Sequence, residues 1–369
     1  MTQFYGKTKI CYGVDAMESL EQLAAKKAFI VTDQFMVKTG FVDRVVSHLD
    51  RRGVSHLVFS DVESDPSLET VTRGAKLFLE NRADLLIALG GGSPIDAAKA
   101  IVYFAHKASE DVVKPTLVAI PTTSGTGSEV TDISVVTDKV NEVKIPLSDE
   151  LLIPDVAILD ARFTRTLPPA ITGATGMDVL THAIEAYTSR QANAFTSIYA
   201  RYAIRYVFSY LLRAYRNGDD MEAREHMLLG SCMAGMAFNN SGLGITHSIA
   251  HSLGGMFHIP HGLANAVVLP QVIRFNSFDV GIRFQEIAQM LSLPAATVEE
   301  GTSSLIKAVC DLNEAMGIPA RISMLEIGQE EYFNNLEVIS CNVLNDICTQ
   351  GNPRKPSKRD IIELLKLAW

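Results

Sequence analysis

The chain has 369 residues, 47% of them hydrophobic, which is long enough for two domains that each bury a core. Its 33 Lys and Arg residues against 42 Asp and Glu residues give a net charge of -9, which disfavours nucleic acid as a partner. No apolar stretch approaches the roughly 18 residues of a membrane span, so we expect no membrane partner and a cytoplasmic protein. The five cysteines are scattered, without CxxC spacing, and are expected to be reduced, mostly buried thiols.

The first 120 residues alternate short β-rich apolar runs with amphipathic runs of helical length, the pattern of parallel strands with crossover helices. The predicted strands are 28–32, 55–59, 85–89 and 116–120, and the predicted helices are 35–52, 67–81 and 94–106. Alternating β-branched residues between 131 and 160 predict a few further strands that close this domain. The predicted fold class of this half is α/β, with a doubly wound sheet.

After Pro168 and Pro169 the sequence is helical in period to the C-terminus, with turns expected at Gly218, Gly242 and Gly317. We therefore predict an α/β domain at residues 1–165. An all-α domain is predicted at 166–369. The boundary is placed to within about 10 residues.

Two loops rich in glycine and hydroxyl residues follow consecutive predicted strands. The run Gly90–Ser93 opens a helix, whose free N–H groups favour a diphosphate, and the run Thr122–Ser128 follows the next strand. Both lie at carboxyl ends of strands, where open α/β sheets bind ligands. Each loop alone could be an ordinary turn, and neither has the GxGxxG spacing of a standard Rossmann site. Together they predict a nucleotide site.

Asp33 ends the strand AFIVTD. A carboxylate there could accept hydrogen bonds from an adenosine ribose and repel a 2′-phosphate, which favours NAD over NADP. The alternative is that Asp33 is a turn residue or a helix N-cap.

Acidic and imidazole side chains recur at helical spacing in the second half. Asp178 and His182 are four residues apart, as are His247 and His251, and His261 begins a segment that could fold back onto the preceding helix. Burying imidazoles among Ile, Leu and Met is costly unless a metal and an ionised carboxylate satisfy them. Three nitrogens and one oxygen suit Fe(II) or Zn(II), and the absence of a thiolate leaves the choice open.

The remaining histidines have a simpler explanation, because a lone histidine is more often a hydrogen-bonded core residue than a ligand. We apply this interpretation to His48, His56, His106, His226 and His258.

Four segments resemble the iron-containing alcohol dehydrogenase family, over essentially the whole chain. They are GGGSPIDAAK at 90–99, PTTSGTGSEVT at 121–131, GMDVLTHAIEAY at 176–187 and GLGITHSIAHSLGGMFHIPHGLANAVVLP at 242–270. HGLANAV and the NPR at 352–354 are most similar to the short 1-propanol and ethanol dehydrogenases of propanediol or ethanolamine use. The resemblance implies a dehydroquinate-synthase-like fold.

The resemblance also implies roles for individual residues. Asp178, His182, His247 and His261 would be the metal ligands, and His251 a proton-relay residue. The residues implied at the NAD(H) cofactor are Asp33, Gly90, Gly91, Gly92, Ser93, Asp96, Thr122, Thr123, Thr126, Ser128 and Lys144. Three apolar residues near these motifs, Ile133, Phe238 and Phe257, are expected to line the substrate pocket, with core packing as the alternative.

The expected activity is interconversion of short primary alcohols and aldehydes, propanal or acetaldehyde in particular, with Fe(II) or alternatively Zn(II) lowering the pKa of the alcohol. A lactaldehyde or diol reductase and a glycerol-type dehydrogenase are the alternatives. A dehydroquinate-synthase-like lyase and a non-catalytic nucleotide and metal sensor are less favoured, and His182 counts against the lyase and the glycerol-type enzyme. A homodimer or larger homo-oligomer is expected, in the cytoplasm or a bacterial microcompartment.

Overall fold

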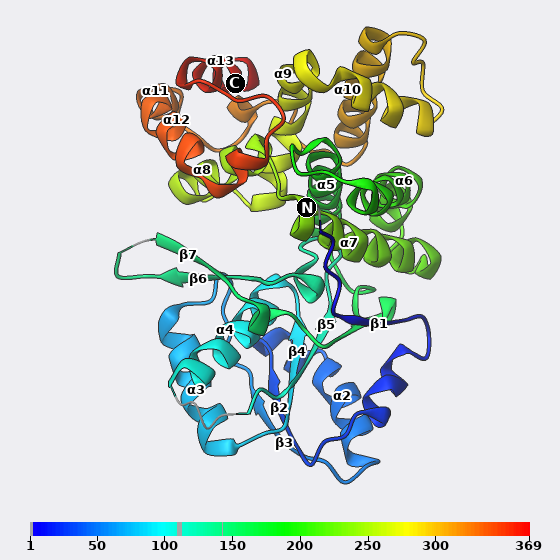
Figure 1. Ribbon diagram of the computed structural model, residues 1–369, viewed down its shortest axis with the longest axis vertical. Helices are drawn as coiled ribbons and strands as arrows, with labels where there is room; N and C mark the ends of the chain where they lie inside the picture. The colour runs from blue at the N-terminus through cyan, green and yellow to red at the C-terminus, as the bar shows by residue number, and fades with distance from the viewer. Residues whose placement is uncertain (1–2, 109–112, 142) are drawn as a thin grey trace. The chain divides into compact units, whose positions relative to one another are not determined.

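The computed structural model describes residues 3–108, 113–141 and 143–369. The chain folds into two compact units, which Figure 1 shows in blue to green and in green to red. One unit is α/β and comprises residues 5–166, and the other is helical and comprises residues 167–369 together with Gln3 and Phe4. Among the described residues, no helix is both long and apolar enough to cross a membrane.

The α/β unit is built on a six-stranded parallel sheet with strand order β1-β8-β5-β4-β2-β3. Its strands are β1 Lys9–Tyr12, β2 Lys27–Val31, β3 Ser55–Phe59, β4 Leu85–Gly90, β5 Thr116–Pro121 and β8 Val156–Leu159. Its helices are α1 Gln34–Lys38, α2 Phe41–Asp50, α3 Leu68–Asn81 and α4 Gly92–Ala108. The strands β6 Ile133–Asp138 and β7 Val143–Ser148 form a separate antiparallel pair.

The central strands are apolar after their first residues, since helices cover both faces of the sheet (Figure 1). Along β2, Phe29 and Val31 pack in the core cluster that contains α3 and α4. The alternate residues Ala28 and Ile30 pack in the cluster that contains α2. The carboxyl ends of β4 and β5, which hydrogen bond to each other, therefore present their two loops side by side.

Two features of this unit differ from the sequence prediction. The single helix expected at 35–52 is two helices, because Gly40 adopts a left-handed φ of 72° between α1 and α2. Strand β1 was not predicted. It is a four-residue edge strand whose side chains are partly exposed, so its sequence KICY lacks the apolar run of the central strands.

The helical unit packs its long helices around α5, which is buried over most of its length. Its helices are α5 Pro169–Thr188, α6 Ala194–Arg216, α7 Met221–Ser241, α8 Ile245–Phe257, α9 His261–Met290, α10 Val298–Ala315, α11 Gln329–Asn334, α12 Leu336–Asn345 and α13 Lys358–Ala368. A second core cluster joins α8 and the first half of α9 to α11, α12 and α13. These contacts fix α5, α8 and α9 as neighbours.

Two expectations about cysteine and histidine are wrong. All five cysteines are free, but Cys232 alone is fully buried, and Cys310 and Cys341 are exposed. None of the five histidines assigned to the core is buried. His258 is exposed, and it caps the C-terminal end of α8 in the left-handed conformation, with a φ of 54°.

Candidate functional site

Four side chains from three helices of the helical unit converge on one point. Asp178 and His182 lie one turn apart on α5, His247 is on α8, and His261 is the first residue of α9. Each offers one ligand atom, and these atoms all lie within 4.8 Å of one another. The fold therefore brings the segment 176–187, which carries Asp178 and His182, together with the segment 242–270, which carries the two other histidines.

The carboxylate of Asp178 is the centre of this cluster. Its Oδ1 atom lies 3.6 Å from Nε2 of His247 and 3.4 Å from Nε2 of His261. Asn265, one turn further along α9, donates a hydrogen bond of 2.7 Å to the same oxygen. The start of α9 can approach α5 closely because residue 262 is glycine. A Cβ atom there would lie 2.3 Å from the carbonyl oxygen of Ala174.

A buried carboxylate, Glu185, orients His247. It lies on α5, is 4% exposed, and its Oε2 atom is 2.6 Å from Nδ1 of His247. The backbone N–H groups of Gly244 and Thr246 also donate to it, at 2.9 Å and 2.7 Å. In the neutral ring, with Nδ1 donating to Glu185, the lone pair of His247 would be on Nε2. This Nε2 atom is buried and has no hydrogen-bond partner among the described residues.

The electrostatics of the cluster favour added positive charge. Burial acts to raise the pKa of Asp178, but the three surrounding imidazoles outweigh it and hold that pKa below its ordinary value. Burial acts to lower the pKa of His247, but Glu185 and Asp178 outweigh it and raise that pKa to about 9. The negative field that retains a proton on His247 would equally attract a divalent cation.

The residues present fit a divalent metal. One carboxylate and three imidazoles are a ligand set for Fe(II) or Zn(II), and a carboxylate that orients a ligating histidine is the usual support of such a site. The buried Nε2 atom of His247 would provide a lone pair once a metal displaces its proton.

His251 lies beside this cluster, one turn after His247 on α8. Its ring stacks on that of His261 with centroids 5.3 Å apart, and its side chain is 44% exposed. Nδ1 of His251 is 2.8 Å from Oδ2 of Asp346. Burial acts to raise the pKa of Asp346, but the hydrogen bond and charge of His251 together with the hydrogen bonds from Cys348 outweigh it and lower that pKa to about 2.

In the α/β unit, the two predicted nucleotide loops touch each other. Gly90 and Gly92 bound the turn between β4 and α4, and a Cβ atom on Gly92 would lie 2.8 Å from the side chain of Thr126. Gly91 similarly faces Thr123, and Thr122 is buried. The helix α4 begins in this turn, so its first N–H groups are at the carboxyl edge of the sheet.

Two of the predicted cofactor residues have structural partners within this unit. Asp96 accepts hydrogen bonds from the Ser128 hydroxyl at 2.6 Å and from the Val135 N–H at 3.1 Å. Lys99, fully buried, donates to the Ser128 hydroxyl at 3.0 Å, so one network joins α4 to the second loop. Glu129 belongs to the same buried region and is 1% exposed. Burial lowers the pKa of Lys99 to about 8 and raises the pKa of Glu129 to about 7.

The remaining predicted cofactor residues are at the edge of the unit. Asp33 is the N-cap of α1, and its Oδ1 accepts from the Met36 N–H at 2.9 Å, so the N-cap alternative is observed. Lys144 lies on β7 and forms an ion pair of 2.7 Å with Asp65. The hydroxyl of Ser93 accepts from the Asp65 N–H at 3.3 Å.

The three apolar residues expected in the substrate pocket have different surroundings. Phe238 stacks on the ring of His182 with centroids 4.5 Å apart, and it is a buried residue of the core cluster around α5, as the alternative of core packing expects. Phe257 is partly buried and packs near Tyr332, at 6.2 Å between centroids, against the core formed by α8, α11 and α13. Ile133 is 37% exposed at the start of β6.

Sequence reasoning missed Glu185, Asn265, Asp346 and Lys99. Glu185 lies three residues after His182, on the same helix face, which is the one local signal that could have indicated it. Asp346 is distant in sequence from His251 and carries no local signal.

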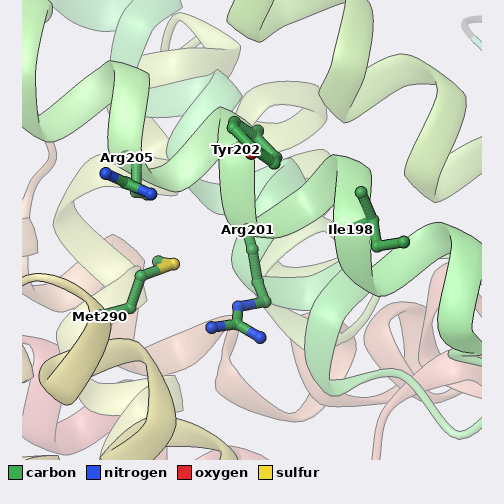
Figure 2. Close-up of a pocket in the computed structure, with 5 residues that line it drawn as sticks. All are labelled: Ile198, Arg201, Tyr202, Arg205 and Met290. Atoms are coloured by element: carbon green, nitrogen blue, oxygen red, sulfur yellow. The ribbon is translucent and has the colours of Figure 1, made fainter.

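A further hollow in the helical unit is a cavity of about 260 Å³ (Figure 2). It is lined by Ile198, Arg201, Tyr202, Arg205 and Met290. None of these belongs to the metal cluster, and guanidinium groups provide no ligand atom for a cation. This hollow is therefore not the candidate catalytic site.

A largely buried cluster of three imidazoles and one carboxylate, in a chain that also carries glycine-rich strand-to-helix loops, defines the class of metal-dependent, nucleotide-using enzymes. The comparison with known families gives a particular answer. Residues 7–161 match the iron-containing alcohol dehydrogenases, and residues 172–369 match the C-terminal part of the Fe-containing alcohol dehydrogenase family. The chain belongs to the iron-containing alcohol dehydrogenase family and is an oxidoreductase.

Individual relatives agree with this membership. The NADPH-dependent butanol dehydrogenase of Clostridium saccharobutylicum is 43% identical over 383 residues, which cover 100% of this chain and 98% of the relative. The 1-propanol dehydrogenase PduQ of Citrobacter freundii is 39% identical over 371 residues, covering 99% of each chain. A crystal structure of a 1,3-propanediol oxidoreductase has a TM-score of 0.94, is 33% identical and covers 100% of each chain. The expected family, fold class and reaction class are confirmed.

Proposed function

We propose that this protein interconverts short unbranched primary alcohols and their aldehydes with NAD(H), and that it depends on a divalent metal held by Asp178, His182, His247 and His261. The observation that carries the proposal is the cluster of these four side chains, three of them buried, with His247 fixed by the Glu185 carboxylate at 2.6 Å. Iron agrees with the name of the family, and zinc is the alternative that the same ligands would accept.

Glu185 and His251 have different roles in the proposed reaction. When bound, the metal supplies a Lewis acid for the alcohol or aldehyde oxygen, and the nicotinamide supplies or accepts the hydride. The Glu185 carboxylate holds the His247 ring so that Nε2 faces the cluster. His251, partly exposed beside the cluster, is placed to exchange a proton with the substrate oxygen or with water.

The substrate class follows from the polarity around the cluster. Phe238 covers the ring of His182, so an apolar face lies against the metal ligands. An apolar wall discriminates weakly for or against an added hydroxyl and selects mainly by chain length, at roughly 1–3 kcal/mol per methylene. We therefore propose propanal, acetaldehyde and butanal as better substrates than lactaldehyde or glyceraldehyde. Ile133 is retained as a proposed pocket residue, whereas the contacts of Phe257 favour core packing.

The coenzyme preference is proposed from Asp33. Its carboxylate follows β2 at the carboxyl edge of the sheet, and Oδ1 caps α1. The other carboxylate oxygen of Asp33, Oδ2, would accept hydrogen bonds from the adenosine ribose. Its negative charge would repel a 2′-phosphate. Gly90 to Ser93, Thr122, Thr123, Thr126 and Lys144 are proposed to contact the dinucleotide, while Asp96 and Ser128 support the loops.

The test is a panel of C2 to C4 aldehydes and diols, assayed with NADH and NADPH on metal-loaded enzyme. We expect propanal with NADH to give the highest kcat/KM. A preference of about tenfold or more for lactaldehyde over propanal would identify a diol-forming reductase instead. We also propose that the protein forms a homo-oligomer, in the cytoplasm or in a microcompartment. Light scattering would measure the size of this oligomer.

A further inference from the structure

A hydrogen-bonded imidazole and carboxylate lie next to the metal cluster. His251 follows His247 by one turn of α8, and its Nδ1 atom is 2.8 Å from Oδ2 of Asp346. Asp346 lies directly after α12 and caps a short 3-10 helix, Ile347–Gly351. One nitrogen of the exposed imidazole is thus engaged by a carboxylate from a different part of the helical unit.

The carboxylate is held in place by groups other than His251. Its Oδ1 atom accepts from the Cys348 N–H at 2.8 Å and from the Ser248 hydroxyl at 3.1 Å. The hydroxyl of Thr349 donates in turn to the Ser248 oxygen at 2.8 Å. Asp346 is 19% exposed at its side chain, whereas His251 is 44% exposed. The hydrogen bonds to Oδ1 therefore hold the carboxylate in place, and Oδ2 accepts from the imidazole of His251.

We propose that Asp346 is the positioning residue for His251, fixing its ring orientation and keeping the proton of the neutral ring on Nδ1. This inference rests on the proposed function, because it supposes that His251 exchanges a proton with the substrate oxygen. An ionised carboxylate only accepts hydrogen bonds, so the nitrogen that faces it must donate. Nε2 then becomes the nitrogen that exchanges the proton.

The proton balance of the pair is simple. In alcohol oxidation Nε2 takes up one proton, and the resulting imidazolium keeps its Nδ1–H donated to Asp346, whose negative charge stabilises it. In aldehyde reduction the same proton leaves Nε2 for the product oxygen, and the ring returns to its neutral form. Asp346 stays ionised in both directions, so the carboxylate neither gains nor loses a proton.

The variant that separates positioning from capping is Asp346→Asn. Asparagine caps helices as well as aspartate does, and its carbonyl oxygen can still accept from Cys348 and Ser248. Its amide nitrogen, however, would face Nδ1 of His251 and donate to it, which moves the ring proton to Nε2. Asp149→Asn is the matched control, because Asp149 caps the short 3-10 helix Glu150–Leu152 in the α/β unit by accepting from Leu151 at 2.9 Å.

The experiment measures kcat, KM, the solvent deuterium isotope effect and the metal content of metal-loaded enzyme reducing propanal with NADH. A general acid–base group contributes roughly 10²- to 10⁴-fold, and Asp346→Asn retains the imidazole, so we expect kcat to fall about 10- to 100-fold. The KM for propanal and the metal content should stay within about twofold, and the solvent isotope effect on kcat should increase. Asp149→Asn should change none of these quantities.

A double-mutant cycle with His251→Gln keeps the test decisive. If Asp346 acts through His251, then Asp346→Asn should cost little further activity once His251 is glutamine. Additive losses would overturn the inference, as would an unchanged kcat in Asp346→Asn or a loss of metal in proportion to the loss of activity. Failure of the wild-type enzyme to reduce any aldehyde would instead overturn the proposed function.

Discussion

The substitution Glu185→Gln tests how the metal cluster is supported. Glu185 is buried and accepts three hydrogen bonds. Oε2 accepts from the Gly244 N–H and from Nδ1 of His247, and Oε1 accepts from the Thr246 N–H. A glutamine has the same shape, but its amide nitrogen donates. Whichever way the amide turns, at least one buried N–H loses its acceptor, at a cost of about 1–3 kcal/mol in the free energy of unfolding of the metal-free protein.

The larger effect of Glu185→Gln should be on metal affinity. Loss of a hydrogen-bonded partner of a metal-ligating histidine typically weakens metal binding by about 10- to 100-fold. This corresponds to about 1.4–2.7 kcal/mol of binding free energy. At saturating metal the stabilisation of the folded protein should fall by the same amount, since metal that binds only the folded state stabilises it through its affinity.

The assay is competition with a chromophoric chelator, combined with denaturant unfolding of metal-free and metal-loaded protein. Glu363→Gln is the control, because Glu363 is exposed and pairs with Arg359 on the surface of α13. Such a change should stay within about 0.5 kcal/mol. Unchanged metal affinity in Glu185→Gln would refute the view that this carboxylate fixes His247 for a metal.

Three further predictions concern the α/β unit. Lys99→Met should lower the free energy of unfolding by about 3–5 kcal/mol, because Asp96 and Glu129 lose their buried cation. The control is Lys76→Met at an exposed position, which should change that free energy by no more than about 0.5 kcal/mol. Denaturant unfolding measures both. Burial raises the pKa of Glu129 from 4.5 to about 7, so its contribution to stability is present below pH 4.5 and is lost as the pH rises to 7. Glu129→Gln should therefore gain stability relative to wild type between pH 4.5 and 8, and equal pH dependence of the two proteins would contradict this. Asp33→Gly should weaken the preference for NADH over NADPH in kcat/KM, and unchanged selectivity would exclude Asp33 from coenzyme choice.

Much of the architecture could be predicted because its signals are local. The strands β2, β4 and β5 are buried on both faces and so read as short apolar runs bounded by turn residues. The candidate metal residues could be found because Asp178 and His182 share a helix face, and because Pro260 and His261 begin a new helix. The spacing of two residues within one helix or strand determines whether they share a face, whatever the tertiary arrangement is.

The rest depends on contacts between distant segments. Nothing in the local sequence pairs His251 with Asp346, which lie 95 residues apart and meet through packing of α8 against α12. Gly40 divides a continuous helical pattern by its backbone conformation alone. Phe257 and Phe238 are both apolar residues near the same motif, and only packing distinguishes Phe238, which is buried against His182, from Phe257, which is partly buried beside Tyr332.

The central claim is that aldehyde reduction requires one divalent cation held by Asp178, His182, His247 and His261. The most direct measurement is NADH oxidation with propanal as a function of bound metal, for demetallated protein reloaded with Fe(II) or Zn(II). His261→Ala is the informative variant, because His261 is 40% exposed at its side chain and its truncation should leave the fold intact. We predict that wild-type activity rises in proportion to metal, up to one ion per chain, and that His261→Ala is not restored because three ligands hold the ion poorly. Full activity in metal-free protein would contradict the account.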